Sequence, residues 1–77
     1  MLITAVESST LANIAYDSIH QSLWLKFRNH AVYCYLGVPQ SVHDGLLAAT
    51  SKGAFFNRNI RGHFPFQRQI EPPTSHL

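Results

Sequence analysis

The sequence predicts an α+β domain in which a small antiparallel β-sheet carries one or two short helices. Two observations predict this class. Apolar residues alternate with a period of two over residues 11–16, 23–27 and 31–36, which is typical of strands with one buried face. The pattern then changes to helical spacing, because Pro39 suits a first helical turn and Val42, Leu46 and Ala49 fall on one stripe.

Residues 22–28 and 31–36 are expected to pair as a hairpin with a two-residue turn at Asn29-His30. In that register each apolar residue of one strand meets an apolar residue of the other, and Lys26 stays outside the core, where an unpaired charge would be costly. The predicted buried face contains Leu23, Leu25, Phe27, Val32, Cys34 and Leu36. The predicted opposite face contains Trp24, Lys26, Tyr33 and Tyr35.

The helical region is expected to divide in two. Ser41 and Asp44 can form a capping box for the first helix, and Ser51-Lys52-Gly53 can end it, with Gly53 in the left-handed capping position. A short second helix is predicted over residues 54–60. Its buried side would contain Phe55, Phe56 and Ile60.

The length of 77 residues supports one domain, predicted over residues 1–70, with a flexible tail over residues 71–77 that contains Pro72-Pro73. Cys34 is the only cysteine, which excludes an internal disulfide and favours a reducing, cytoplasmic location. No segment is long and apolar enough to cross a membrane, so a membrane partner is not expected.

Several short motifs occur in an order that resembles the KTSC domain, a module found at the C-terminus of some lysyl-tRNA synthetases and alone in small bacterial proteins. The resemblance covers about residues 6–68. The motifs that carry it are Val6-Glu7-Ser8-Ser9, Tyr16-Asp17, Tyr33-Cys34-Tyr35, Gly37-Val38-Pro39, Ser51-Lys52-Gly53 and Asn59-Ile60-Arg61-Gly62. The chain departs from the family pattern at Asn29-His30, where glycine is usual, and at Phe64-Pro65-Phe66, where the family has Tyr-Pro-Tyr.

The resemblance implies a compact sheet with helical additions, or a small Sm-like partial barrel. Members of the family are generally of unknown function, and the synthetase context implies RNA as a partner. Charge agrees with an anionic partner, because residues 45–70 hold four basic side chains and no acidic one. The alternative is an ordinary solvated surface.

Two groups of residues are candidates for binding RNA or single-stranded nucleic acid. The first is the strand face with Trp24, Lys26, Tyr33 and Tyr35, on which bases could stack; alternatively these rings form a second core layer, covered by a helix or by Phe64 and Phe66. The second group is Lys52, Arg58 and Arg61, which could contact phosphates. The alternative for Lys52 and Arg58 is simple exposure, and for Arg61 it is a salt bridge to Glu7 or Asp17.

Enzymatic activity is not expected. The five histidines are scattered and interpreted as surface residues, no metal or other cofactor is predicted, and Cys34 should be buried and inert. The chain also has no phosphate-binding glycine loop or nucleophile elbow. The rival to nucleic-acid binding is therefore a protein-interaction or structural module that acts as a homodimer.

Overall fold

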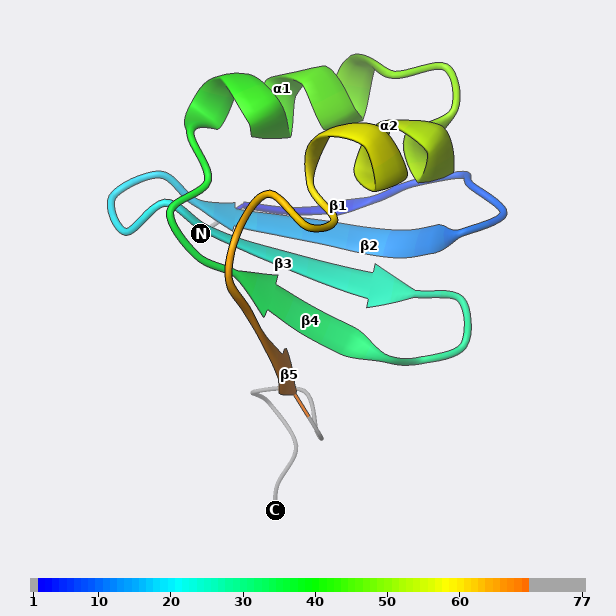
Figure 1. Cartoon of the computed structure of the whole chain (residues 1–77). Coiled ribbons are helices and arrows are strands. Elements are labelled where there is room, and N and C mark those ends of the chain that lie inside the picture. The colour runs from blue at the N-terminus through cyan, green and yellow to red at the C-terminus, as the bar shows by residue number, and fades with distance from the viewer. Residues whose placement is uncertain (1, 70–77) are drawn as a thin grey trace.

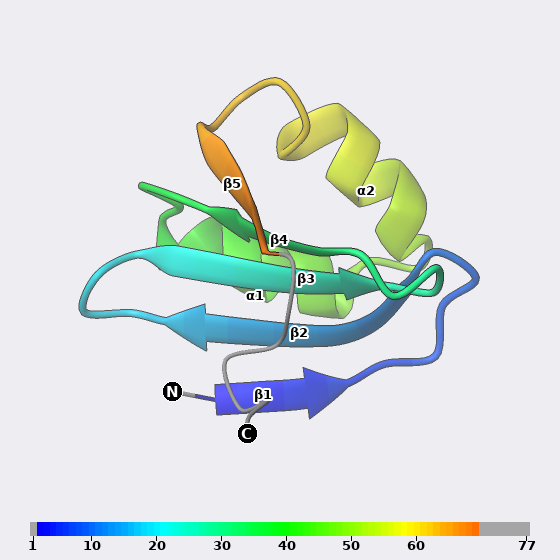
Figure 2. The same cartoon turned by 90° about the horizontal axis from the view of Figure 1, so that it is seen from below.

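The structure is a computed structural model that describes residues 2–69, and it confirms the α+β class. Its elements in chain order are β1 (Leu2–Ala5), β2 (Leu11–Asp17), β3 (Ser22–Phe27), β4 (Val32–Tyr35), α1 (Gln40–Ala48), α2 (Lys52–Asn59) and β5 (Phe66–Gln69). The five strands form one antiparallel sheet in the order β1-β2-β3-β4-β5. Both helices lie over the same face of this sheet (Figure 1), and the view from below shows the other face of β1–β4 without a helix (Figure 2).

The two edge strands were not predicted as strands. β1 comes from the apolar opening of the chain, and β5 directly follows the extended segment around Pro65. Neither alternates between apolar and polar residues, because Leu2 and Ile3 are adjacent apolar residues in β1 and Phe66 is followed by three polar residues in β5. The predicted tail at residues 71–77 lies outside the described residues, and the domain limits of 1–70 stay a prediction.

The predicted hairpin between β3 and β4 is present, but its predicted register is wrong by one residue. Leu25 pairs with Tyr33 and Lys26 pairs with Val32, whereas the expected partners of these β3 residues were Cys34 and Tyr33. The loop contains three residues, Arg28-Asn29-His30, closed by hydrogen bonds of 2.9 Å from the Phe27 amide to the Ala31 carbonyl and from the His30 amide to the Phe27 carbonyl.

Backbone sterics explain the longer turn. A two-residue hairpin turn of type I′ needs positive φ at both central residues, Asn29 and His30. In the observed loop only His30 has positive φ, at 73°. A three-residue turn with one left-handed residue therefore replaces a turn that would have strained two non-glycine residues.

The shift changes which side chains share a face. Tyr33 and Tyr35 lie with Leu23, Leu25 and Phe27 on the helix-covered face, instead of with Trp24 and Lys26. The helix-free face receives Trp24, Lys26, Val32 and Cys34. Patterning could not decide this, because β4 is apolar on both faces. Of the predicted buried residues, Val32 and Cys34 are buried on the opposite side of the sheet from Leu25, and Leu36 is exposed.

The helix boundaries also differ from the expected ones. Pro39 is the N-cap of α1 and no side chain caps the N-terminus of this helix, so the predicted capping box of Ser41 and Asp44 is wrong. Ser51 caps α2 instead, accepting a hydrogen bond of 3.3 Å from the Ala54 amide. Gly53 lies inside α2 rather than ending α1. Glycine is needed at this position because a Cβ would stand 2.6 Å from the hydroxyl oxygen of Thr10.

The core fills the space between the helices and their face of the sheet. The strand β2 bulges between Leu11 and Asn13, so Leu11 joins Ile14 and Tyr16 in that core. The buried core residues are Leu11, Ile14, Tyr16, Leu23, Leu25, Tyr35, Val38, Leu46, Phe56 and Ile60. Both helices are thus fixed on the sheet by apolar burial, and the C-terminal end of α2 is held near β4 and β5.

Candidate functional site

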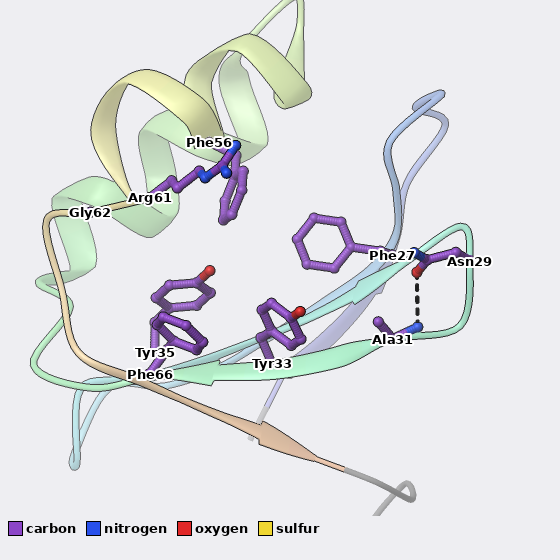
Figure 3. Close-up of a pocket in the computed structure, with 9 residues that line it drawn as sticks. All are labelled: Phe27, Asn29, Ala31, Tyr33, Tyr35, Phe56, Arg61, Gly62 and Phe66. Carbon is purple, nitrogen blue, oxygen red and sulfur yellow. Dashed lines mark hydrogen bonds between the residues drawn. The ribbon is translucent and has the colours of Figure 1, made fainter.

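A cleft of about 350 Å³ opens between the end of α2, the strand β4 and the edge strand β5. We call it the aromatic cleft. Figure 3 shows the side chains that line it, which come from both strands of the hairpin, its turn, α2 and β5. They are Phe27, Asn29, Ala31, Tyr33, Tyr35, Phe56, Arg61, Gly62 and Phe66.

Five rings form a continuous aromatic wall in this cleft. Tyr33 and Phe66 are stacked, with ring centroids 5.4 Å apart and planes 17° apart. Phe66 also lies 5.3 Å from Tyr35, and Phe56 closes the cluster with edge-to-face contacts to Phe27 at 5.2 Å and Tyr35 at 5.7 Å. Such edge-to-face and offset packing is the favourable geometry for aromatic pairs.

Ring exposure increases from the floor of the cleft to its rim. Tyr35 is only 2% exposed and belongs to the core, Tyr33 is half-buried, and Phe66 is 53% exposed. Phe66 reaches the surface because it begins an edge strand, where it is the pairing partner of Tyr35. The sheet therefore presents the rim ring Phe66, on a rigid packed base, to solvent.

Positive charge flanks these rings. Arg61 follows α2 and lines the cleft, and the guanidinium carbon of Arg68 lies 6.0 Å from the centroid of the Tyr33 ring, within cation–π range. Burial raises the pKa of the Tyr35 phenol, the nearby Tyr33 adds to the rise, and Arg61 partly offsets it. Among residues 2–69, no carboxylate lines the cleft, so these side chains suit an anionic or aromatic ligand.

Three of the seven residues predicted for nucleic-acid binding meet in this cleft. Tyr33, Tyr35 and Arg61 line it. Phe66 packs on the rings of both tyrosines, so the alternative prediction of a ring layer covered by other aromatic side chains is also partly met. Trp24 and Lys26 lie on the opposite face of the sheet because of the register shift, and so cannot act with the tyrosines.

The other two predicted residues lie outside the cleft. The Lys52 ammonium donates to the carbonyls of Leu47 at 3.1 Å and Ala49 at 3.0 Å, so this side chain caps the end of α1. Arg58 is exposed on α2 and does not line the cleft. Within residues 2–69 no ion pair joins Arg61 to Glu7 or Asp17; the carboxylate of Asp17 bonds to the ring of His20 at 2.7 Å.

Sequence reasoning missed most of the cleft wall. Phe27 and Phe56 were predicted only as core residues, and Phe66 only as a cover for other rings. Arg68 was counted in the basic segment but given no role. The available signal was the aromatic pair around Pro65, since proline favours an extended strand that can lay a ring beside β4.

The interpretation of His43 as a surface residue is wrong. It is buried in α1, stacks on Tyr16 with ring centroids 4.6 Å apart, and its Nδ1 lies 3.3 Å from the carboxylate of Asp44. Within the part of the chain that the structure describes, no three metal-ligating side chains lie together, and neither helix is long and apolar enough to span a bilayer.

Residues of the short motifs make hydrogen bonds that hold the loops in place. The hydroxyl of Ser8 accepts hydrogen bonds from the amides of Thr10 and Leu11, and Arg28 donates to the carbonyls of Ser8 and Val6. The Tyr16 hydroxyl donates to the carbonyl of Val38, which ties β2 to the start of α1. These contacts hold the loops in place, whereas Tyr33, Tyr35, Arg61 and Gly62 of the motifs line the aromatic cleft.

Comparisons with known proteins agree on one family. The family model described as the KTSC domain matches residues 7–64. A crystal structure of a KTSC domain protein from Yersinia pestis superposes with a TM-score of 0.85 at 37% identity, covering 88% of this chain and 96% of that one.

Curated relatives are of two kinds. A small protein of Tsukamurella paurometabola is 44% identical over 77% of this chain and 88% of its own length. A lysine–tRNA ligase of Nostoc punctiforme is 39% identical over 80% of this chain. The match spans only 11% of that ligase.

Proposed function

The chain belongs to the KTSC domain family, and from this premise we propose that it is a non-enzymatic module that binds single-stranded nucleic acid, RNA above all, in the aromatic cleft. Binding would be weak and largely independent of sequence, because stacking accepts every base. The relation to lysine–tRNA ligases supports RNA as the partner and the cytoplasm as the location.

The observation that carries this proposal is the rim of the cleft. The half-buried ring of Tyr33 and the exposed ring of Phe66 stack on each other, Arg61 lines the same cleft, and the Arg68 guanidinium lies over the Tyr33 ring. A base could extend the stack at Phe66, while a guanidinium contacts the adjoining phosphate. Stacking on aromatic side chains contributes about 1–3 kcal/mol per base, which suits a weak, general binder.

The test is fluorescence anisotropy with a labelled, unstructured octanucleotide RNA. We expect saturable binding at low salt that weakens steeply as salt is raised, because phosphate contacts release counterions. A flat signal with micromolar protein at low salt would overturn the proposal.

A matched pair of arginine variants places the binding in the cleft. Arg61 lines the cleft and Arg58, three residues earlier, does not. We expect Arg61→Gln to weaken RNA binding severalfold and to lower the salt dependence, with Arg58→Gln close to wild type. Equal effects would show that only the general positive charge matters.

The helix-free face favours a homodimer as a second candidate function. Ile3, on the edge strand β1, is 67% exposed, and Trp24 is half-buried on the same face with no helix above it. An exposed strand edge beside apolar side chains can pair with a second copy. Light scattering across concentrations tests this, and a monomer mass throughout would exclude it.

A further inference from the structure

A second hollow adjoins the aromatic cleft at the β3–β4 turn. It has a volume of about 410 Å³ and lies between this turn and the end of β5. Its lining residues are Asn29, His30, Ala31, Arg68 and Gln69, and it shares Asn29 and Ala31 with the aromatic cleft. We call it the turn pocket. The two hollows therefore meet at the β3–β4 turn.

The turn pocket is built from hydrogen-bond donors. The Asn29 side-chain oxygen accepts a hydrogen bond of 3.0 Å from the Ala31 backbone amide (Figure 3). This leaves the side-chain nitrogen of Asn29 free to donate elsewhere. Arg68 contributes a guanidinium and His30 an exposed imidazole, and among residues 2–69 no carboxylate lines the hollow. Such a set of hydrogen-bond donors matches a phosphate group.

His30 occupies a backbone position at which glycine would make the folded state more stable. It is the loop residue with φ of +73°, the left-handed position that glycine fills without steric cost. A histidine there strains the backbone and places an imidazole beside Arg68 at the pocket. Strain of this kind gathers at functional sites, where the side chain serves binding rather than stability.

We propose that the turn pocket holds the phosphate of the nucleotide whose base stacks in the aromatic cleft, which rests on the function proposed above. Arg68 joins the two hollows, because its guanidinium lies over Tyr33 of the cleft and also lines the turn pocket. Arg68, His30 and Asn29 would then surround one phosphate, and the site would recognise a base and a phosphate together.

The test compares three probes by following backbone amide shifts in NMR titrations: adenosine, adenosine monophosphate and inorganic phosphate. We expect the monophosphate to bind at least about threefold more tightly than adenosine, in keeping with charge-assisted hydrogen bonds on an exposed surface. Its shifts should include Asn29, His30 and Arg68. Inorganic phosphate should move the same amides only at higher concentration; if it binds as tightly as the nucleotide, the link to the stacked base is wrong.

Two variants separate the pocket from the cleft. His30→Gly and Arg68→Gln should each reduce the preference for the monophosphate over adenosine. His30 is not among the residues that line the aromatic cleft, so His30→Gly should also leave adenosine binding unchanged. His30→Gly should also raise the melting temperature by a few degrees, because glycine relieves the strain. Lower phosphate affinity in a more stable protein cannot result from partial unfolding.

The outcomes distinguish the two proposals. If RNA and adenosine bind but both variants keep the full preference for the monophosphate, the turn pocket is not the phosphate site and the cleft proposal stands. If neither RNA, adenosine nor the monophosphate binds, both proposals are overturned.

Discussion

The two faces of the β3–β4 hairpin have similar residues and different surroundings. One face carries Trp24 and Lys26, the other Tyr33 and Tyr35, so each offers rings, with positive charge nearby. The aromatic cleft opens on the second face, because α2 and β5 extend beyond β4 and place Phe56, Arg61 and Phe66 around the tyrosines. Both faces thus offer rings and charge, and the elements at the sheet edge are what shape the cleft.

The largest expected effect is the difference in stability between two neighbours on β3. Leu25 is fully buried under the helices, and Lys26 points to the helix-free face. Leu25→Ala should lower the free energy of unfolding by about 2–5 kcal/mol, because truncation leaves a cavity. Lys26→Ala should cost little. Urea unfolding followed by the fluorescence of the single tryptophan measures both, and equal losses would contradict the assignment of the faces.

The second prediction separates the faces by function. Phe66→Ala should weaken RNA binding about tenfold or more, in line with the 1–3 kcal/mol of one stacking contact. The free energy of unfolding should fall less than for Leu25→Ala, since the Phe66 ring is half-exposed. Trp24→Ala is the matched control, an aromatic truncation on the other face, and should leave RNA affinity unchanged. If Trp24→Ala is the more damaging variant in anisotropy titrations, binding occurs on the helix-free face.

The smallest predicted effect is a loss of stability in alkali. Burial raises the pKa of the Cys34 thiol and of the Tyr35 phenol, one on each face. Folding keeps both groups protonated to a higher pH than in the unfolded chain. Their contribution to the free energy of unfolding is therefore complete below the unfolded pKa values and is lost as pH rises through the folded ones. The loss should begin near the unfolded thiol pKa of about 8.5 and reach at most about 1.4 kcal/mol per pH unit for each group.

Two variants show which group, on which face, causes the fall in the free energy of unfolding with pH. Cys34→Ala should reduce the decline that begins first, and Tyr35→Phe should reduce the one that follows at higher pH. Urea unfolding at a series of pH values between 7 and 11, within the range where these groups ordinarily ionise, provides the measurement. A stability that is flat over that range would show that neither group is protected by burial.

Much of the fold followed from local patterns. β2, β3, β4 and the two helices were all predicted from period and composition, because each has one clearly apolar side or a strong boundary residue such as Pro39. The motifs also indicated the KTSC family correctly. The edge strands were missed, since neither β1 nor β5 alternates between apolar and polar residues.

The candidate site was predicted only in part. Tyr33, Tyr35 and Arg61 were named, but they were grouped with side chains that the structure places elsewhere. Phe66 and Arg68 are brought to the cleft by β5, which pairs with β4 from more than thirty residues further along the chain. No local pattern specifies such a pairing.

The sequence by itself determined the class of the fold, the family and the residues able to form a core, because these depend on period, composition and the order of motifs. Only the tertiary structure decided the register of the hairpin. Both faces of β4 are apolar, so the choice passed to the turn, where one left-handed residue, His30, is less costly than two. That difference of one residue turned Tyr33 and Tyr35 toward α2 and β5, and it decided on which face of the sheet the cleft lies.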